Sequence, residues 1–98
     1  MAVTGSGLIK FKNSLINLLR EGRYTLDGKV YSIPIYKTSI DGDNINIYLY
    51  LDDTVSGHIS QSQLIDRDGE VFDTQAENID KPSINGLLIS FTYNLKKI

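Results

Sequence analysis

Apolar residues recur at steps of three and four over residues 8–19, LIKFKNSLINLL, which is the period of an amphipathic α-helix. The apolar side chains of this segment are Leu8, Ile9, Phe11, Leu15, Ile16, Leu18 and Leu19. The polar side chains expected on the solvent side are Lys10, Lys12, Asn13 and Asn17. Gly22 can adopt the left-handed conformation that ends a helix. The pattern therefore predicts a helix over residues 6–21, after a flexible arm of residues 1–5.

Beyond the helix, apolar and polar residues alternate, and a period of two is typical of half-buried β-strands. The segment INIYLYL places four apolar side chains on one face: Ile45, Ile47, Leu49 and Leu51. The segment LLISFTYNL places five there: Leu87, Ile89, Phe91, Tyr93 and Leu95. Asp27 with Gly28, residues 41–44, and Asp68 with Gly69 are turn signals, because Asp and Gly tolerate the backbone angles of tight hairpins. Residues 78–86, NIDKPSING, are predicted to form a loop.

These elements predict an α+β fold, with the N-terminal amphipathic helix packed on one face of an antiparallel sheet of five to seven strands. Residues 1–98 form a single predicted domain, with residues 23–97 mainly in antiparallel strands. The helix residues expected in the core are Leu8, Phe11, Leu15, Ile16 and Leu19. Their expected partners on the strands are Ile47, Leu49, Ile89 and Phe91.

Composition and charge exclude several classes of function. The chain has 98 residues, a net charge of −2 and no cysteine, so cysteine-ligated zinc and thiol catalysis are excluded. Lys and Arg are scattered, whereas a nucleic-acid surface needs clustered positive charge, so we expect no nucleic-acid partner. No apolar run approaches the roughly 20 residues of a membrane span, and the start lacks the apolar segment of a signal peptide. We therefore expect no membrane association, and a protein that acts where it is made or is carried out as part of something larger.

The stretch LIDRDGEV, residues 64–71, is the strongest candidate for a metal site, because Asp66, Asp68 and Glu70 alternate there. A calcium-binding EF-hand loop needs its glycine at position 6, but Gly69 falls at position 4 counted from Asp66. Acidic residues beside glycine are also typical of plain turns. We therefore predict a turn, and keep these three carboxylates only as weak candidates for a surface cation, with help from Asp43, Asp52 or Asp53.

His58 is the only histidine, and we predict an ordinary exposed residue on a strand. A histidine that acts as a general base needs a bound carboxylate and a nearby nucleophile. The chain has no nucleophile-elbow motif of the GxSxG type. We therefore expect no enzymatic activity, no catalytic residue and no cofactor.

Three of the six tyrosines are candidate interface residues: Tyr36, Tyr48 and Tyr50. Tyr48 and Tyr50 alternate with the apolar side chains of their strand, so they lie on its other face. That face is either a half-buried layer of the fold or an interface, at which tyrosine is enriched. Exposed edge strands offer a second route to association, and Pro34, which cannot donate to a sheet, is expected at one edge.

The chain resembles a family of small structural proteins in its layout. The segments are GHISQSQLIDRDGEV, NIDKPSINGLLISFTYNLKKI and the opening GSGLIKFKNSLINLL. They resemble the attachment domains of tail-fibre and baseplate proteins from phages and prophages of Gram-positive bacteria. The resemblance implies a non-enzymatic assembly protein whose partners are other tail proteins or itself, as a homo-oligomer. It also implies a cytoplasmic location during assembly, and then a virion or a phage-tail-like particle.

An alternative function is that of a small ligand-binding module. Such a module would bind a sugar through the tyrosine face, or calcium through the acidic loops. An assembly protein should associate with itself or a neighbour without any small ligand, and this difference separates the two hypotheses.

Overall fold

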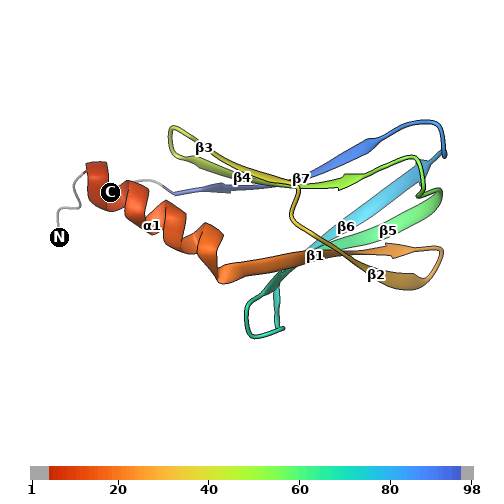
Figure 1. Cartoon of the computed structure of the whole chain (residues 1–98), viewed down its shortest axis with the longest axis horizontal. Helices are drawn as coiled ribbons and strands as arrows, with labels where there is room; N and C mark the ends of the chain where they lie inside the picture. Colours follow the sequence, from red (N-terminus) through yellow and green to blue (C-terminus); the bar gives the residue numbers. More distant parts are fainter. Residues whose placement is uncertain (1–4, 96–98) are drawn as a thin grey trace.

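The computed structural model describes residues 5–95 of the chain. Helix α1 (Gly5–Leu18) comes first, and seven antiparallel strands follow it within this range (Figure 1). The strands are β1 (Leu19–Leu26), β2 (Lys29–Ile33), β3 (Lys37–Asp41), β4 (Asn44–Leu51), β5 (Gly57–Asp66), β6 (Val71–Lys81) and β7 (Leu87–Asn94). The predicted α+β class is confirmed, since one helix packs against antiparallel sheets.

The described strands form two sheets, whereas the sequence analysis expected one. One sheet has four strands in the order β2-β1-β5-β6, and the other has three in the order β3-β4-β7. Each alternating strand has a single apolar face, so two sheets that face each other can bury both sets of apolar side chains. Pro34 lies where the chain leaves β2 for β3, at the predicted sheet edge, because it has no N–H with which to continue a ladder.

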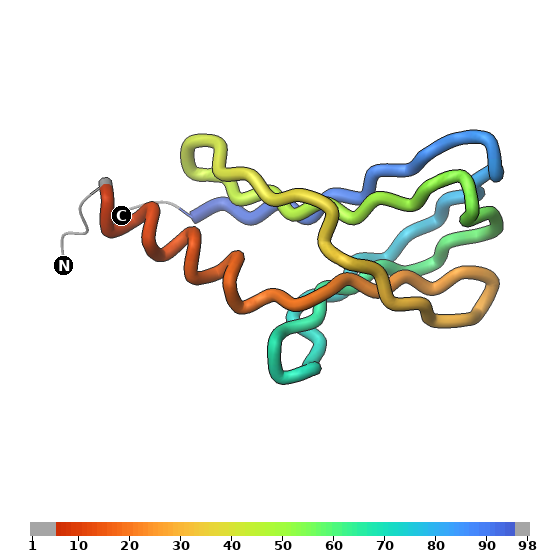
Figure 2. The backbone as a smooth tube through the Cα atoms, viewed as in Figure 1, coloured from red at the N-terminus to blue at the C-terminus, as the bar shows by residue number. Residues whose placement is uncertain are grey.

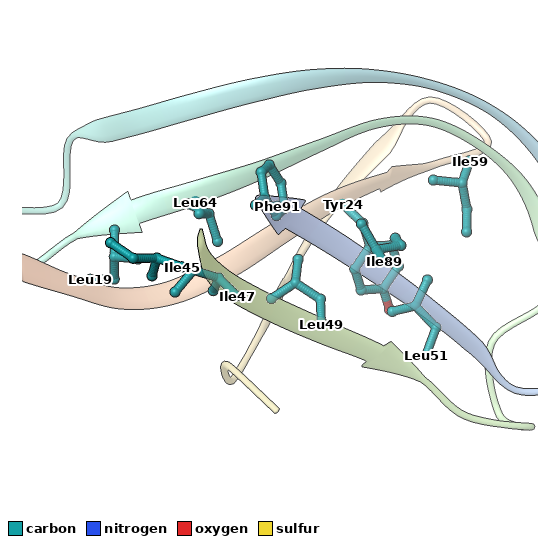
Figure 3. Packing of buried hydrophobic residues seen from close by; sticks show 10 residues of the cluster. All are labelled: Leu19, Tyr24, Ile45, Ile47, Leu49, Leu51, Ile59, Leu64, Ile89 and Phe91. Atoms are coloured by element: carbon teal, nitrogen blue, oxygen red, sulfur yellow. The ribbon is translucent and has the colours of Figure 1, made fainter. Parts of the chain in front are cut away.

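The core lies between the two sheets, as Figure 3 shows. The alternation predicted for β4 is confirmed, because its four inward side chains are all fully buried. Ile89 and Phe91 of β7 extend the same layer. The facing layer comes from β1 and β5, through Leu19, Tyr24, Ile59 and Leu64.

Helix α1 ends at Leu18 and β1 begins at the next residue, so the prediction of a helix over residues 6–21 is wrong at its C-terminal end. The turn between β5 and β6 ends the helix instead of Gly22. The backbone N–H of Arg67 in this turn donates to the Leu18 carbonyl at 2.9 Å, and its side chain donates to the Asn17 carbonyl. A cation at this point satisfies carbonyls that the helix leaves free.

Gly22 lies within β1 and faces the other sheet. A Cβ atom added to it would stand 2.3 Å from Cδ2 of Leu49 and 2.6 Å from Cδ1. Leu49 is fully buried, so it fills the space that a side chain at position 22 would need. The predicted role of Gly22 as a helix cap is therefore wrong, and its actual role is to let the two sheets meet.

The hairpin turns form where the sequence predicted them, whereas the loop predicted over residues 78–86 is shorter than expected. Asp27 and Gly28 both have positive φ, at 50° and 85°, as a type I′ turn requires. Residues 78–81 were expected in a loop but belong to β6, where Ile79 pairs with Ile59 of β5. This apolar pair continues the ladder, so the connection from β6 to β7 shortens to residues 82–86.

Figure 2 shows that different elements lie at the two ends of the molecule. Helix α1, the β3–β4 turn and the end of β7 lie at one end, which we call the helix end. The β1–β2, β4–β5 and β6–β7 connections lie at the other, which we call the distal end. The predicted arm lies outside the described residues except for Gly5, which begins α1, and Lys96 and Lys97 lie outside them as well. No helix within residues 5–95 is long and apolar enough to cross a membrane.

Replacing Gly22 by Ala should destabilise the fold by about 1–3 kcal/mol, because the added methyl group overpacks a rigid core. Shortening the opposing side chain in the double variant Gly22→Ala/Leu49→Val should recover part of this loss. Chemical denaturation of both single variants and the double variant measures the coupling. Additive effects of the two substitutions would contradict the contact.

Candidate functional site

Helix α1 is held to the sandwich by polar contacts in the middle of its buried side and at its C-terminal end. The ammonium of Lys12 donates to the backbone carbonyl of Gly42 in the β3–β4 turn, and Lys12 is only 3% exposed. At the C-terminal end of the helix, the carbonyls of Asn17 and Leu18 accept the bonds from Arg67. The prediction that Lys12 lies on the solvent side is therefore wrong, because its stem is buried while its amine reaches a carbonyl.

The Lys12 contact determines which side of α1 faces the sheets. Successive helix residues are about 100° apart, so Leu8, Lys12 and Leu15 share one side of the helix. Phe11 and Leu18 lie on the flank of that side, and their side chains are 57% and 53% exposed. The prediction that Phe11 is buried is wrong, because Lys12 and not Phe11 occupies the middle of the buried side.

An apolar stripe therefore runs along the uncovered flank of α1. It consists of Phe11, Leu15 and Leu18, spaced four and three residues apart, and we call it the α1 stripe. Leu15 at its centre is partly buried against the core, so the stripe joins the core to the surface. Ile9, on the opposite flank, is 52% exposed. The apolar period in the sequence identified these residues as the apolar face of the helix but did not predict that some of them are exposed.

The elongated shape of the molecule is consistent with a helix that extends beyond the core between the two sheets. The radius of gyration is 15.0 Å, and the principal extents are 48 × 26 × 19 Å. A compact domain of about 100 residues has a radius of gyration of roughly 13 Å. Figure 1 shows that α1 extends away from the start of β1, on the side of the β3–β4 turn. The four-stranded sheet does not cover the three-stranded sheet at this end.

A second apolar surface lies at the distal end, on the outer face of the three-stranded sheet. The rings of Tyr36 and Tyr50 are in contact, with centroids 5.2 Å apart. Leu88 pairs with Tyr50 across β4 and β7, and all three side chains are at least 40% exposed. We call Tyr36, Tyr50 and Leu88 the distal patch. Ile84, in the adjoining β6–β7 turn, is 84% exposed.

The structure thus brings the three predicted tyrosines to one face, although Tyr48 contributes less than the others. Tyr48 is half-buried, and its backbone carbonyl accepts a bond from Tyr36. Leu88 was missed by the sequence analysis. The signal was present, since Leu88 is the one apolar residue among the outward positions of β7, which continue with Ser90 and Thr92.

Polar side chains cover the rest of this outer face and bond to one another. The Asn46 amide donates to the Ser39 hydroxyl and accepts from the Thr92 hydroxyl. Nearer the helix end, the Asn94 amide donates to the Asn44 side chain. These amide and hydroxyl groups are uncharged and bond to one another, in contrast to the apolar distal patch.

The acidic turn uses its first carboxylate for its own backbone. One oxygen of Asp66 accepts from the N–H groups of Asp68 and Glu70, each at 2.9 Å, and Gly69 has the positive φ of a turn. Asp68 and Glu70 point to solvent. In the part of the chain that the structure describes, no three His, Asp or Glu side chains gather as metal ligands.

The other acidic candidates lie apart from this turn. Asp43 is in the β3–β4 turn, while Asp52 and Asp53 are in the β4–β5 loop at the distal end. Two hydrogen bonds from Thr54 to the carboxylate of Asp52 hold its pKa below the usual value. The carboxylate of Asp52 thus bonds to groups of its own loop, as the carboxylate of Asp66 bonds to groups of its own turn.

His58 has a carboxylate partner that the sequence analysis did not identify. Its Nδ1 lies 2.7 Å from the side chain of Asp80, the residue opposite it on β6. Asp80 is 90% exposed, so water screens the pair. The backbone N–H of His58 also donates to Asp27, which ties the β1–β2 turn to β5. These contacts hold the strands and turns of the distal end together.

A shallow depression of about 310 Å³ lies beside β1 and β2, lined by Arg20, Glu21, Ser32, Ile33 and Pro34. A hydrogen bond with Ser32 is the main cause of a lowered pKa at Glu21, assisted by neighbouring arginines. Arg20 and Arg23 both contact this carboxylate. The charges of the depression therefore compensate one another.

Polar side chains also fill the side of the sandwich where β6 lies beside β7. The Tyr93 hydroxyl donates to Asp73, and the buried Ser62 hydroxyl donates to Glu77. The Gln75 amide donates to the same Glu77 and reaches the Ser90 carbonyl at 3.4 Å. Inward polar groups on an edge strand oppose pairing with another chain, so this edge is a poor site for strand addition.

Replacing Asp66 by Ala should destabilise the fold by about 1–2 kcal/mol, because two backbone N–H groups lose their acceptor. Asp66→Asn keeps a side-chain oxygen and should lose less. Asp68→Ala is the matched control, with an expected change within about 0.5 kcal/mol, as is usual for an exposed position. Thermal or chemical unfolding checks the order of the three variants, and an equal loss in all would contradict the turn geometry.

Burial, and secondly the bond to Asp73, raise the pKa of Tyr93 above its ordinary value. A phenol whose pKa is higher in the folded state stabilises the fold fully below about pH 10, and this stabilisation is lost as the pH rises further. The free energy of unfolding should therefore fall above about pH 10, and fall less in Tyr93→Phe. Asp73→Asn should lie between the two, because burial still acts on the phenol. Equal alkaline slopes in all three proteins would contradict this role.

No family model, curated protein or solved structure matches the chain. The resemblance of its layout to phage tail attachment domains therefore stays a prediction. The candidate functional sites are two exposed apolar surfaces of the molecule itself. These are the α1 stripe at one end and the distal patch at the other.

Proposed function

We propose that this protein is a non-enzymatic assembly protein that acts by binding another protein through α1. The observation that carries the proposal is the α1 stripe, an apolar surface left uncovered on a helix that is itself firmly attached. Single exposed apolar residues are common on protein surfaces, but clustered ones such as Phe11 and Leu18 mark interaction sites.

The energetic gain from covering the stripe is sufficient to matter. Full burial of a Phe or Leu side chain contributes about 1.5–3 kcal/mol. Since Phe11 and Leu18 are each a little more than half exposed, a partner could gain about 1 kcal/mol or more from each. A third contribution comes from the exposed edge of Leu15.

The attachment of α1 also favours binding. Lys12 and Arg67 hold the helix at two points, and β1 continues directly from Leu18. A helix that is already ordered does not lose backbone conformational entropy when it binds, so more of the contact energy appears as affinity.

The proposed setting is a phage or prophage tail, in which the protein joins other tail components or copies of itself. Support for this setting comes from the layout of the sequence, with its short opening helix, acidic turn and late apolar strand. The location then follows the particle, first the cytoplasm during assembly and then the finished tail.

A second candidate function is the binding of a neutral sugar on the outer face of the three-stranded sheet. It is favoured by the aromatic pair Tyr36 and Tyr50, which lies next to a neutral row of amide and hydroxyl groups. This candidate predicts that affinity depends on Tyr50 and not on the α1 stripe.

The double variant Phe11→Ser/Leu18→Ser should abolish self-association while leaving the fold intact, because both side chains are already exposed. The wild-type mass, measured by light scattering, should rise above the 11.0 kDa of one chain as the concentration increases. The variant should remain at the mass of a single chain.

Val30→Ser is the matched control, since Val30 is 61% exposed on β2, away from α1. It should associate as the wild type does. A wild type that stays monomeric at every concentration, or a double variant that associates normally, would contradict self-association through α1.

A further inference from the structure

We infer that the Asn85–Gly86 peptide unit is a site of spontaneous covalent modification, at which Asn85 loses its side-chain amide and a carboxylate forms next to the distal patch. This site lies in the β6–β7 connection and not on α1, so the inference is independent of the proposed function. Three features support it: the place of Asn85 in the fold, the free nitrogen of Gly86, and the known chemical lability of asparagine.

Asn85 differs from the other asparagines of the chain in its position. The other six are Asn13 and Asn17 in α1, Asn44 and Asn46 in β4, Asn78 in β6 and Asn94 in β7. Each of them lies in a helix or strand, and each is followed by Ser, Leu or Ile, whose side chain crowds the next backbone nitrogen. Asn85 lies between strands and is followed by glycine, which has no side chain.

The backbone nitrogen of Gly86 is not used by the fold. The ladder between β4 and β7 begins one residue later, at the pair of Leu51 with Leu87. Within residues 5–95, no backbone hydrogen bond of a turn or loop uses the Gly86 N–H. Asn85 and Gly86 are both exposed, and an N–H that is exposed and carries no hydrogen bond exchanges its proton readily with solvent.

The β6–β7 connection is anchored on both sides of Asn85. The amine of Lys81 donates to the carbonyls of Val55 and Pro82, at 2.6 and 3.2 Å, and Leu87 is paired with β4. Residues 82–86 between these anchors are all exposed. The reacting unit is therefore on the surface of the folded protein, and the reaction does not require unfolding.

The reaction needs only water and hydroxide as co-reactants. The Gly86 nitrogen gives its proton to hydroxide and attacks Cγ of Asn85, so that a new C–N bond closes a cyclic imide. The bond from Cγ to the side-chain nitrogen then breaks, and this nitrogen takes a proton from water and leaves as ammonia. Water adds to either carbonyl of the imide and opens it. The product has a carboxylate at position 85 and either a normal aspartyl or an isoaspartyl linkage to Gly86.

The modification reaches the distal patch because Gly86 lies against the ring of Tyr50. A Cβ atom at position 86 would stand 2.8 Å from Cε1 and Cζ of Tyr50, so only glycine fits there. The isoaspartyl linkage adds one carbon to the main chain directly before Gly86 and so displaces this contact. Tyr50 in turn packs on Tyr36, with ring centroids 5.2 Å apart, so both rings should change their surroundings.

The test follows the full-length protein during incubation at neutral and at mildly alkaline pH. Peptide mass mapping measures the loss of amide at every asparagine, and labelling by an isoaspartyl methyltransferase detects the isoaspartyl linkage in the peptide that contains position 85. The variant is Asn85→Gln, because the longer side chain closes a less favourable ring. The matched control is Asn78→Gln, the same change at an exposed position of β6. The wild type unfolded in guanidinium chloride gives the rate without the fold.

We expect Asn85 to lose its amide faster than each of the other asparagines in the folded wild type and in the control. Its rate should rise with pH, because the Gly86 nitrogen must lose a proton, and should lie within about tenfold of the rate in the unfolded chain. In Asn85→Gln, position 85 should keep its amide. The near-ultraviolet circular dichroism of the tyrosines should change as the wild type is modified and stay constant in Asn85→Gln.

Three outcomes would overturn the inference. If Asn85 reacts more than about tenfold slower in the folded protein than in the unfolded chain, the connection protects it. If another asparagine of the folded protein reacts faster, the place of Asn85 in the fold is not decisive. If the tyrosine spectrum is unchanged after Asn85 has reacted, the modification does not reach the distal patch.

Discussion

Leu49 of β4 packs into the space that Gly22 of β1 leaves open, and the two sheets can meet at this distance only because that space is free. The surrounding core is closely packed, with Ile47 and Leu51 on the same strand fully buried beside Leu49. Interiors of this density leave no room for a displaced side chain. The spacing of the sheets, and with it the position of every element attached to them, therefore depends on a glycine in the middle of a strand.

Helix α1 receives its orientation from polar contacts rather than from its apolar period. Lys12 bonds to the β3–β4 turn and Arg67 to the last carbonyls of the helix, so both sheets take part in holding it. The apolar face of α1 is wider than the side of the helix that these contacts hold against the sheets. Phe11 and Leu18 stay at the surface for this reason, and an anchored helix with an uncovered stripe is a suitable element for assembly.

The β6 edge of the sandwich favours the same conclusion. Strand β6 turns Asp73 and Glu77 inward, where they bind Tyr93 and Ser62. Charged groups that point inward from an edge strand make the addition of a foreign strand unfavourable. Association through exposed strand edges, which the sequence analysis kept as a second route, is opposed on this side of the molecule.

The sequence by itself determined the elements that depend on local chemistry. The alternation in β4 and β7 predicted which side chains form the core, and Asp27 with Gly28 predicted a tight hairpin turn, because period and backbone angle are properties of a few neighbouring residues. The tertiary structure alone decided the split into two sheets, the role of Gly22 and the rotation of α1 about Lys12. Each of these depends on contacts between residues far apart in the chain, and a local pattern does not specify which distant surface it will meet.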